Sequence, residues 1–209
     1  MNGPLPEQFV RFPSQIVSLE TLPTRMSSTL YLLRHADSLA SEDVPEPDWL
    51  LSASGRDQAT ALVPALASLG IDRVVTSPYR RAVQTVAPFA RQHDITLHSD
   101  ERLRERRLTD EWLDDHEAAV RATWDDFEHA HPGGESSAAC QRRVVNAIAG
   151  WTERFPDDTL LLSSHGNVIS FVLRHVDPDF GFPDWRAMQK PELYGIRDGD
   201  WVRVPTHQT

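Results

Sequence analysis

Short apolar runs alternate with longer amphipathic stretches along most of this chain. A short apolar run bounded by polar residues is typical of a buried strand, and the stretches between such runs are typical of helices. The pattern predicts strands at residues 29–33, 71–76, 95–98 and 159–163, and a hairpin over residues 193–204. It predicts helices at residues 51–69, 78–91, 135–155 and 168–175, and helical pieces between residues 108 and 131.

Predicted strands and helices follow one another in turn through the chain. Such alternation is characteristic of a mainly parallel sheet with helices on both faces. We therefore expect an α/β fold, a three-layer α/β/α sandwich, formed by one domain over residues 29–209. Residues 1–28 contain four prolines and no sustained periodicity, so we expect them to form an extended or poorly ordered N-terminal arm.

Several predicted helices carry signals at their ends. Ser52 or Ser54 can cap the first helix by accepting from the free N–H groups of its first turn. Pro64 should kink that helix or remove one of its hydrogen bonds, and Gly70 should end it in the left-handed conformation. Ser77 is followed by proline, which predicts that the next helix begins there.

Cationic and imidazole side chains follow three of the predicted strands. Arg34 and His35 follow the first strand, Arg80 and Arg81 open the helix after the second, and His165 follows the last. Ligands in open α/β sheets bind outside the carboxyl ends of strands, and helix N-termini and arginine forks both bind phosphate. Each piece alone would more often be a turn or a solvated helix face. If the pieces converge, they form an anion site with two histidines.

Glu105 is the only acidic residue between Glu101 and Asp110, inside a strongly basic run. It could form a surface ion pair, which would contribute little to stability. It could instead act as a general acid that protonates a leaving oxygen. The sequence pattern leaves both interpretations open.

Charge and composition restrict the class of partner. The formal net charge of −10 and the pI of about 5.3 oppose nucleic acid or an anionic membrane as a main partner. The single cysteine, Cys140, excludes an intrachain disulfide and is expected to be a buried small residue. No Cys and His spacing resembles a metal site; His129 and His131 are the nearest candidates. No apolar run is long enough to span a membrane, and no signal-peptide pattern is present, so we expect a cytoplasmic protein.

The same residues resemble a set of motifs shared by the histidine phosphatase superfamily, the phosphoglycerate mutase-like proteins. Any one motif is weak evidence, but here the set stands in the family's order across about residues 29–175. The motifs are Leu33-Arg34-His35-Ala36, Leu51-Ser52 with Gly55 and Gln58-Ala59, Ser77-Pro78-Tyr79-Arg80-Arg81-Ala82-Val83-Gln84-Thr85, Leu103-Arg104-Glu105, Pro132-Gly133-Gly134-Glu135-Ser136 and Ser164-His165-Gly166.

The resemblance implies a phosphoglycerate mutase-like fold and a role for each matching residue. His35 would be the nucleophile that forms a phosphohistidine, and Arg34 and Arg81 would bind the phosphate. His165 would be the second histidine of the phosphate pocket, and Glu105 would be the proton donor and later the base for water. A covalent histidine intermediate splits one hard transfer into two easier steps. Neither a cofactor nor a metal is implied.

Three further residues beside the motifs, Ser38, Ser41 and Asn167, are expected to contact the substrate. Ser41 departs from the family pattern, because the mutases carry Asn six residues after the catalytic histidine. A second departure is that residues 107–112 replace the Gly-x-Trp-x-Gly block that often follows the Leu-x-Glu motif. The chain is also shorter than mutases usually are, which leaves less material for a lid that keeps water from a phosphohistidine.

These observations favour a metal-independent phosphomonoesterase that acts on a small phosphorylated metabolite. The acidic stretch 110–128 is expected to overhang the site, and Arg106 or Arg107 could contact a carboxylate or second phosphate of the substrate or lie at the surface. One alternative is a phosphoglycerate mutase-type phosphotransferase with the same residues. Another is a regulatory module that binds phosphorylated ligands, including phosphohistidine, although a pure binder would not need a proton donor. The sequence leaves the oligomeric state open, with a dimer as one option.

Overall fold

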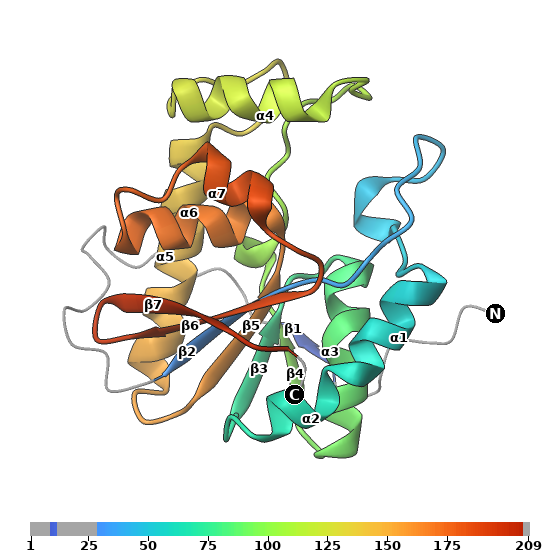
Figure 1. The fold of residues 1–209 in the computed structure, drawn as a ribbon, viewed down its shortest axis with the longest axis vertical. Helices are drawn as coiled ribbons and strands as arrows, with labels where there is room; N and C mark the ends of the chain where they lie inside the picture. Colours follow the sequence, from blue (N-terminus) through green and yellow to red (C-terminus); the bar gives the residue numbers. More distant parts are fainter. Residues whose placement is uncertain (1–8, 12–28, 207–209) are drawn as a thin grey trace.

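The structure is a computed structural model that describes residues 9–11 and 29–206 (Figure 1). Among these residues a seven-stranded sheet has the order β1-β4-β3-β5-β2-β6-β7. The five strands from β1 to β2 in this order are parallel to their neighbours, and β6 and β7 are antiparallel. The strands are β1 (Phe9–Arg11), β2 (Leu30–Arg34), β3 (Arg73–Thr76), β4 (Leu97–Ser99), β5 (Leu160–Ser164), β6 (Glu192–Arg197) and β7 (Asp200–Val204).

Helices cover both faces of this sheet, as Figure 1 shows. Helices α1, α2 and α3 lie on one face, α5 and α6 lie on the other, and α4 lies beyond the carboxyl ends of the strands. The helices are η1 (Glu46–Asp48), α1 (Ala53–Ala61), α2 (Val63–Ala67), α3 (Arg80–Gln92), η2 (Glu101–Leu103), α4 (His116–Asp125), α5 (Ser137–Arg154), α6 (Gly166–Val176) and α7 (Phe182–Ala187).

The central strands are buried on both faces, so their apolar side chains serve two cores in alternation. Leu32 and Leu162 pack with α5 and α6, where Ile148 and Phe171 are also buried. The neighbouring residue Leu33 points to the opposite face and packs with α2 and α3. This alternation produces the three-layer α/β/α sandwich and confirms the predicted fold class.

The local signals of the first helix act as predicted. The Ser52 hydroxyl accepts from the backbone N–H of Gly55 at 3.0 Å, which caps α1. The helix breaks at Leu62, and Pro64 lies in the first turn of α2, where it has no intrahelical bond to disrupt. Gly70 then has a φ of 62°, which is the left-handed conformation that glycine adopts without strain.

The predicted start of the next helix at Ser77 is wrong. Helix α3 begins at Arg80, and Tyr79 occupies the N-cap position without a side-chain cap. The Ser77 hydroxyl accepts from the backbone N–H of Tyr79 at 3.2 Å, which closes a turn before the helix. The same hydroxyl is bonded to His165, so a tertiary contact uses the group that would otherwise cap the helix.

Strands β1 and β7 form the two edges of the sheet. Residues 9–11 of the predicted N-terminal arm form β1, which pairs with β4 in parallel. The rest of that arm lies outside the described residues. At the other edge, Asp198 and Gly199 both have positive φ and join β6 to β7, which confirms the predicted hairpin. None of the helices in the described part of the chain is both long and apolar enough to cross a bilayer.

Candidate active site

The carboxyl ends of β2, β5 and β3 lie side by side because these three strands are neighbours in the sheet (Figure 1). In the pairing of β2 with β5, Arg34 lies opposite Ser164, and in the pairing of β3 with β5, Thr76 lies opposite Ser163. The backbone N–H of His35 donates to the Ser164 carbonyl at 3.0 Å, which holds the chain just beyond the strand end. The convergence expected from the sequence is therefore a direct result of parallel pairing.

His35 is buried, with 5% of its surface exposed, and both of its ring nitrogens have partners. The Nε–H of Arg81 donates to Nε2 of His35 at 3.2 Å, and Nδ1 of His35 lies 2.7 Å from the carbonyl oxygen of Ala36. Because a guanidinium group can only donate, Nε2 is unprotonated and Nδ1 carries the proton. Burial, and then the charge of Arg81, hold the pKa of His35 well below its usual value. The ring is therefore a neutral imidazole whose electron pair on Nε2 accepts the hydrogen bond from Arg81.

Residues of the second and third motifs hold the loop that follows His35. The Thr85 hydroxyl accepts from the backbone N–H of Ala36 at 3.0 Å and donates to the Arg81 carbonyl at 2.7 Å. Gln58 accepts from the backbone N–H of Asp37 at 3.0 Å. Gly55 lies so close to this loop that a Cβ atom there would collide with the Asp37 carbonyl oxygen.

Arg81 is 2% exposed, and each of its three guanidinium nitrogens makes a hydrogen bond. Besides its contact with His35, it donates through Nη1 to the Glu46 carbonyl at 2.8 Å and through Nη2 to Glu46 Oε1 at 2.6 Å. The guanidinium carbon lies 5.3 Å from the Trp49 ring centre and 5.1 Å from that of Tyr79. The expected phosphate-binding arginine thus already holds a carboxylate of the protein.

Arg34 lies against the N-terminus of α6. Its Nη1 donates to the Met188 carbonyl at 2.7 Å, and its Nε has no hydrogen-bond partner among the described residues. A Cβ atom on Gly166 would come within 3.1 Å of the guanidinium group, so this glycine lets the side chain lie across the start of the helix. Burial lowers the pKa of Arg34, and the charge of Glu105 opposes that change.

His165 is fully buried at the N-cap position of α6. Its Nε2 lies 2.8 Å from the Ser77 hydroxyl, and its ring centre lies 5.3 Å from that of His35 in an edge-to-face arrangement. Burial, together with the charge of Arg81, holds the pKa of His165 well below its usual value. The positive charge that acts on both histidines includes that of Arg81 and Arg34.

Glu105 follows η2 and is half-buried, and its Oε1 accepts from the backbone N–H of Arg106 at 2.8 Å. Its negative charge opposes the lowering of the Arg34 pKa by burial, and it adds to the raised pKa of Glu46 after the effects of burial and of Arg81, so the carboxylate acts on the same pocket. Asn167, the second residue of α6, is 4% exposed. Its Oδ1 accepts from Nη2 of Arg106 at 3.4 Å.

The two predicted serines lie in the segment that leads from His35 to η1. Ser38 forms an isolated antiparallel bridge with Leu51, and the Ser41 hydroxyl accepts from the backbone N–H of Asp43 at 3.2 Å. Within the described part of the chain, no hydrogen bond joins either hydroxyl to His35 or to the two arginines of the pocket. Their contact with substrate stays a prediction.

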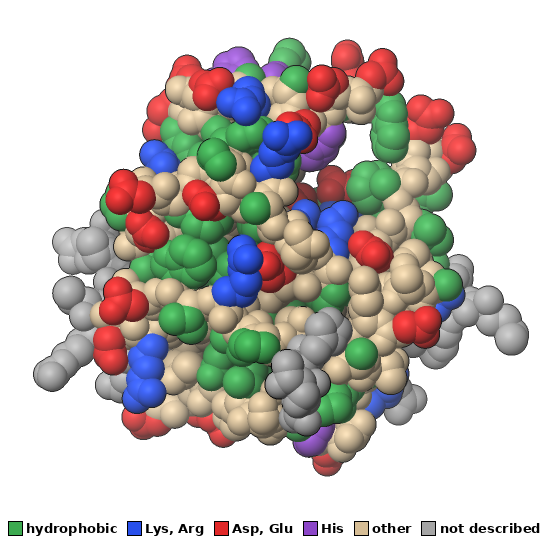
Figure 2. Space-filling model, in the orientation of Figure 1, with side chains coloured by type: hydrophobic (Ala, Val, Ile, Leu, Met, Phe, Trp, Pro, Cys, Tyr) green, Lys and Arg blue, Asp and Glu red, His purple; other side chains and the backbone are tan. Residues whose placement is uncertain are grey.

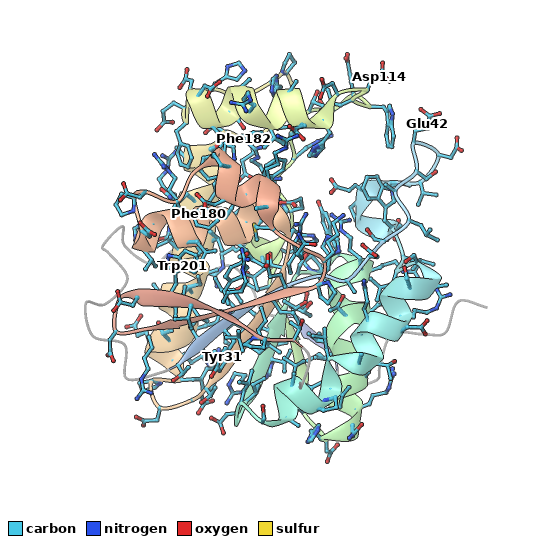
Figure 3. All side chains as sticks on the ribbon, viewed as in Figure 1. Tyr31, Glu42, Asp114, Phe180, Phe182 and Trp201 are labelled. Atoms are coloured by element: carbon cyan, nitrogen blue, oxygen red, sulfur yellow. The ribbon has the colours of Figure 1, made fainter. Side chains whose placement is uncertain are left out.

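A hollow lies between α4 and the segment that contains η1, and Figure 2 shows Lys or Arg, Asp or Glu and His side chains around it. Figure 3 places Glu42 and Asp114 at the tips of the two segments that border it. Trp49 and Trp112 contact each other edge to face, with ring centres 6.4 Å apart. The segment that contains η1 and the acidic stretch 110–128 both lie over the carboxyl ends of the strands.

The two arginines that could reach the substrate differ in place. Arg107 is exposed and pairs with Asp110. Arg106 is buried, so of the two alternatives left open by the sequence the surface position is wrong for it. In the described residues no three His, Cys, Asp or Glu side chains gather closely enough to hold a metal ion, and independence from metal stays a prediction.

Sequence reasoning missed three residues of this site. Glu46 carries no local signal, because its partner Arg81 lies far along the chain, whereas Thr85 stands in the third motif but was given no role of its own. Lys190 is the only lysine in the chain, and its charge lowers the pKa of His35, after burial and the charge of Arg81. A single lysine among 21 basic Lys and Arg residues was a signal that could have drawn attention to it.

Comparison with known proteins agrees with this geometry. The family model described as "Histidine phosphatase superfamily (branch 1)" matches residues 30–193. The chain belongs to the histidine phosphatase superfamily. A glucosyl-3-phosphoglycerate phosphatase of Mycolicibacterium vanbaalenii is 28% identical over 198 residues, which cover 85% of this chain and 84% of that relative. The protein named "Probable phosphoglycerate mutase GpmB" of Salmonella newport is 27% identical over 167 residues, covering 75% and 76% of the two chains.

A solved structure shows the same fold. The mycobacterial glucosyl-3-phosphoglycerate phosphatase superposes with a TM-score of 0.69 and 23% identity, covering 87% of this chain and 99% of its own. Together these comparisons confirm the predicted family, the fold and the enzyme class, a phosphatase of the histidine phosphatase superfamily. The roles of the individual residues remain to be tested.

Proposed function

We propose that this histidine phosphatase is a metal-independent phosphomonoesterase in which Nε2 of His35 attacks the phosphorus atom of a small phosphorylated metabolite. The observation that supports the proposal is the hydrogen bond from Nε–H of Arg81 to Nε2 of His35. That bond leaves the electron pair of the neutral imidazole on Nε2, and the Ala36 carbonyl fixes the proton on Nδ1. A nucleophile needs this tautomer before substrate arrives.

The reaction proceeds in two transfers. In the first, Nε2 forms a bond to phosphorus while the bond from phosphorus to the ester oxygen breaks, and Glu105, which is protonated in the substrate complex, supplies the proton that the leaving oxygen takes up. In the second, water attacks the phosphohistidine, the bond between nitrogen and phosphorus breaks, and the Glu105 carboxylate accepts a proton from the water. Inorganic phosphate leaves, and His35 and Glu105 return to their starting states.

Charge on the transferring phosphoryl group is stabilised by groups that are already in place. Arg34 and Arg81 supply positive charge, and the N-terminus of α6 supplies backbone N–H groups beside His165. Arg81 is held by Glu46 before substrate binds, so the phosphoryl oxygens must share or replace that carboxylate. Substrate binding therefore includes a rearrangement at Glu46.

The substrate class follows from the size and charge of the site. A cluster of two arginines and two histidines matches one phosphate group, and the tryptophans and acidic side chains at the hollow favour a small, modestly charged remainder. The relative named for glucosyl-3-phosphoglycerate is consistent with such a substrate. We place the reaction in the cytoplasm, with a dimer as one option and without a nucleic-acid or membrane partner.

Phosphoglycerate mutase activity is the second candidate, because the relative of the GpmB type also matches most of the chain. It requires a phosphohistidine that survives until a second acceptor binds. The test is isomerisation of phosphoglycerates with a bisphosphorylated primer, measured beside hydrolysis of the same compounds. Isomerisation faster than hydrolysis would favour the mutase over the phosphatase.

The deciding experiment measures hydrolysis of an aryl phosphate in the presence of a chelator. Wild type is compared with His35→Ala, and His129→Ala is the matched control because that histidine is exposed and its ring contacts His131. We expect activity in wild type and in the control and none in His35→Ala. Rapid denaturation during turnover should trap an acid-labile phosphate on the wild-type protein. Substantial activity of His35→Ala would refute the nucleophile assignment.

A further inference from the structure

Arg106 is a buried cation whose partners are all uncharged. It is 2% exposed, and in the part of the chain that the structure describes no carboxylate forms an ion pair with it. Its Nε has no hydrogen-bond partner among those residues. Burying a charge without a counter-charge is costly, and an apolar residue of similar volume at such a place is often as stable or more stable. Packing alone therefore does not account for an arginine here.

The guanidinium group of Arg106 connects three helices. Its Nη1 donates to the Thr123 hydroxyl of α4 at 2.7 Å and to the Ser137 hydroxyl of α5 at 3.0 Å. Its Nη2 donates to Oδ1 of Asn167 on α6 at 3.4 Å. The group also lies 5.3 Å from the centre of the Phe171 ring. Contacts with three helices therefore hold the guanidinium group in one position.

The contact with Asn167 determines the orientation of its side-chain amide. A guanidinium group only donates, so the atom that Asn167 turns toward Arg106 must be its oxygen. The amide nitrogen Nδ2 then points away from Arg106, and no hydrogen bond occupies it among the described residues. Asn167 lies two residues after His165, at the N-terminus of α6. Its two N–H groups are thereby available to an oxygen of the substrate.

The backbone of the same residue holds the expected proton donor. The N–H of Arg106 donates to Oε1 of Glu105 at 2.8 Å. Because the Arg106 side chain is anchored among three helices, the backbone at this point cannot shift without breaking those contacts. One anchored residue therefore controls Asn167 through its side chain and Glu105 through its backbone.

We propose that Arg106 is a positioning residue of the phosphatase reaction, which turns the Asn167 amide N–H groups toward the phosphoryl oxygens and holds Glu105 beside the leaving oxygen. Arg106 does not touch the substrate. The inference rests on the proposed function, since it assigns a supporting residue to the same pocket. It replaces both roles considered from the sequence, a surface residue and a direct contact with a second anionic group.

The test compares Arg106→Met with wild type in two properties. These are the kcat for two phosphate esters and the stability toward urea. An aryl phosphate has a good leaving group that needs little help from a proton donor, whereas an alkyl phosphate depends on one. We expect Arg106→Met to fold with unchanged or higher stability toward urea, because it removes a buried unpaired charge. We expect its kcat to fall about 100-fold on the alkyl ester and clearly less on the aryl ester. Arg73→Met, which loses an arginine paired with Asp158, is the control and should leave both kcat values unchanged.

A second measurement tests whether the effect passes through Asn167. On the aryl ester, Arg106→Met should cost far less in the Asn167→Ala background than in wild type, because the group that it positions is already absent. If Arg106→Met does not fold, Arg106→Lys serves for both comparisons. It keeps the charge but lacks the planar fork that reaches several acceptors.

The outcomes separate this inference from the function on which it rests. Equal losses on both esters would overturn the role at Glu105, and full additivity with Asn167→Ala would overturn the role at Asn167. A loss of activity that simply follows a loss of stability would overturn both. In each of these cases wild type would still hydrolyse phosphate esters through His35. Wild type without activity, or with activity that survives His35→Ala, would instead remove the proposed function itself.

Discussion

The carboxylate of Glu46 accepts a hydrogen bond of 2.6 Å from Nη2 of Arg81, the arginine that also contacts His35, the proposed nucleophile. A carboxylate and a phosphoryl group are both anions with oxygens that fit a guanidinium fork. With Arg81 as the proposed phosphate ligand, Glu46 is expected to compete with substrate for it. Segment 41–51, which brings Glu46 to the pocket, also carries Trp49 to its contact with Trp112.

This competition predicts that Glu46→Gln binds phosphate more tightly. The amide keeps the shape of the side chain but removes the negative charge beside the phosphate position. We expect the inhibition constant of inorganic phosphate to fall about tenfold, which corresponds to about 1.4 kcal/mol. Glu42→Gln, an exposed change in the same segment, is the control and should have little effect. An unchanged constant in Glu46→Gln would show that the two anions do not compete.

The same residue predicts a dependence of anion binding on pH. Burial, supported by the charge of Glu105, raises the pKa of Glu46 above its ordinary value of 4.5 although Arg81 acts in the opposite direction. As pH falls through this raised pKa, Glu46 gains a proton and loses its hold on Arg81. Sulfate, whose own charge does not change in that range, should therefore inhibit wild type more strongly at mildly acidic pH. In Glu46→Gln this increase should be absent or much smaller.

The buried histidines predict that the free energy of unfolding falls in acid. The pKa of His35 and of His165 lies well below 6.5 in the folded protein, first because of burial, whereas in the unfolded chain each takes up a proton near 6.5. Below that pH the unfolded state binds more protons, so stability decreases as pH decreases and levels off above it. Urea unfolding at several pH values should show this slope. His35→Gln should reduce it by up to about 1.36 kcal/mol per pH unit, and an unchanged slope would contradict the assignment.

Substituting Gly55 or Gly70 by alanine should destabilise the protein to different extents. A Cβ atom at Gly55 would collide with the Asp37 carbonyl oxygen, which belongs to the loop after His35. At Gly70, φ is 62° but the space around a Cβ atom is open. We expect Gly70→Ala to destabilise by about 1 kcal/mol from backbone strain alone. Gly55→Ala should destabilise by about 2–3 kcal/mol and lower kcat, because the collision displaces the catalytic loop. Equal effects in denaturant titrations would argue against that close approach.

Lys190 predicts a modest electrostatic contribution to phosphate binding. Its charge acts on His35, and Arg34 holds the segment just before it through the Met188 carbonyl. Lys190→Met should raise the inhibition constant of phosphate about two- to fivefold, while Lys190→Arg should retain the wild-type value. Because the chain has no other lysine, acylation of lysine should reproduce the Lys190→Met effect in wild type. The reagent should not lower phosphate affinity further in Lys190→Met.

Sequence alone determined the features whose causes are local or shared by the family. The apolar runs at β2, β3 and β5 predict parallel strands, and parallel strands place Arg34, His35 and His165 on one edge of the sheet. The turns depend on the residues that form them, so the left-handed Gly70 and the hairpin turn at Gly199 were also predictable. The ordered motifs determined the family, and with it the expected role of each residue.

Tertiary structure alone decided which partner each polar group finds. Ser77 has the residue type of a helix cap, yet its hydroxyl bonds His165, which is 88 residues away along the chain. Arg106 stands in a basic run like its exposed neighbour Arg107, but it lies buried among three helices. The contact of Glu46 with Arg81 forms only when segment 41–51 folds over the strand ends. Periodicity and motifs report local preference and the face that is buried, whereas a hydrogen bond between distant residues depends on how all the packed layers meet.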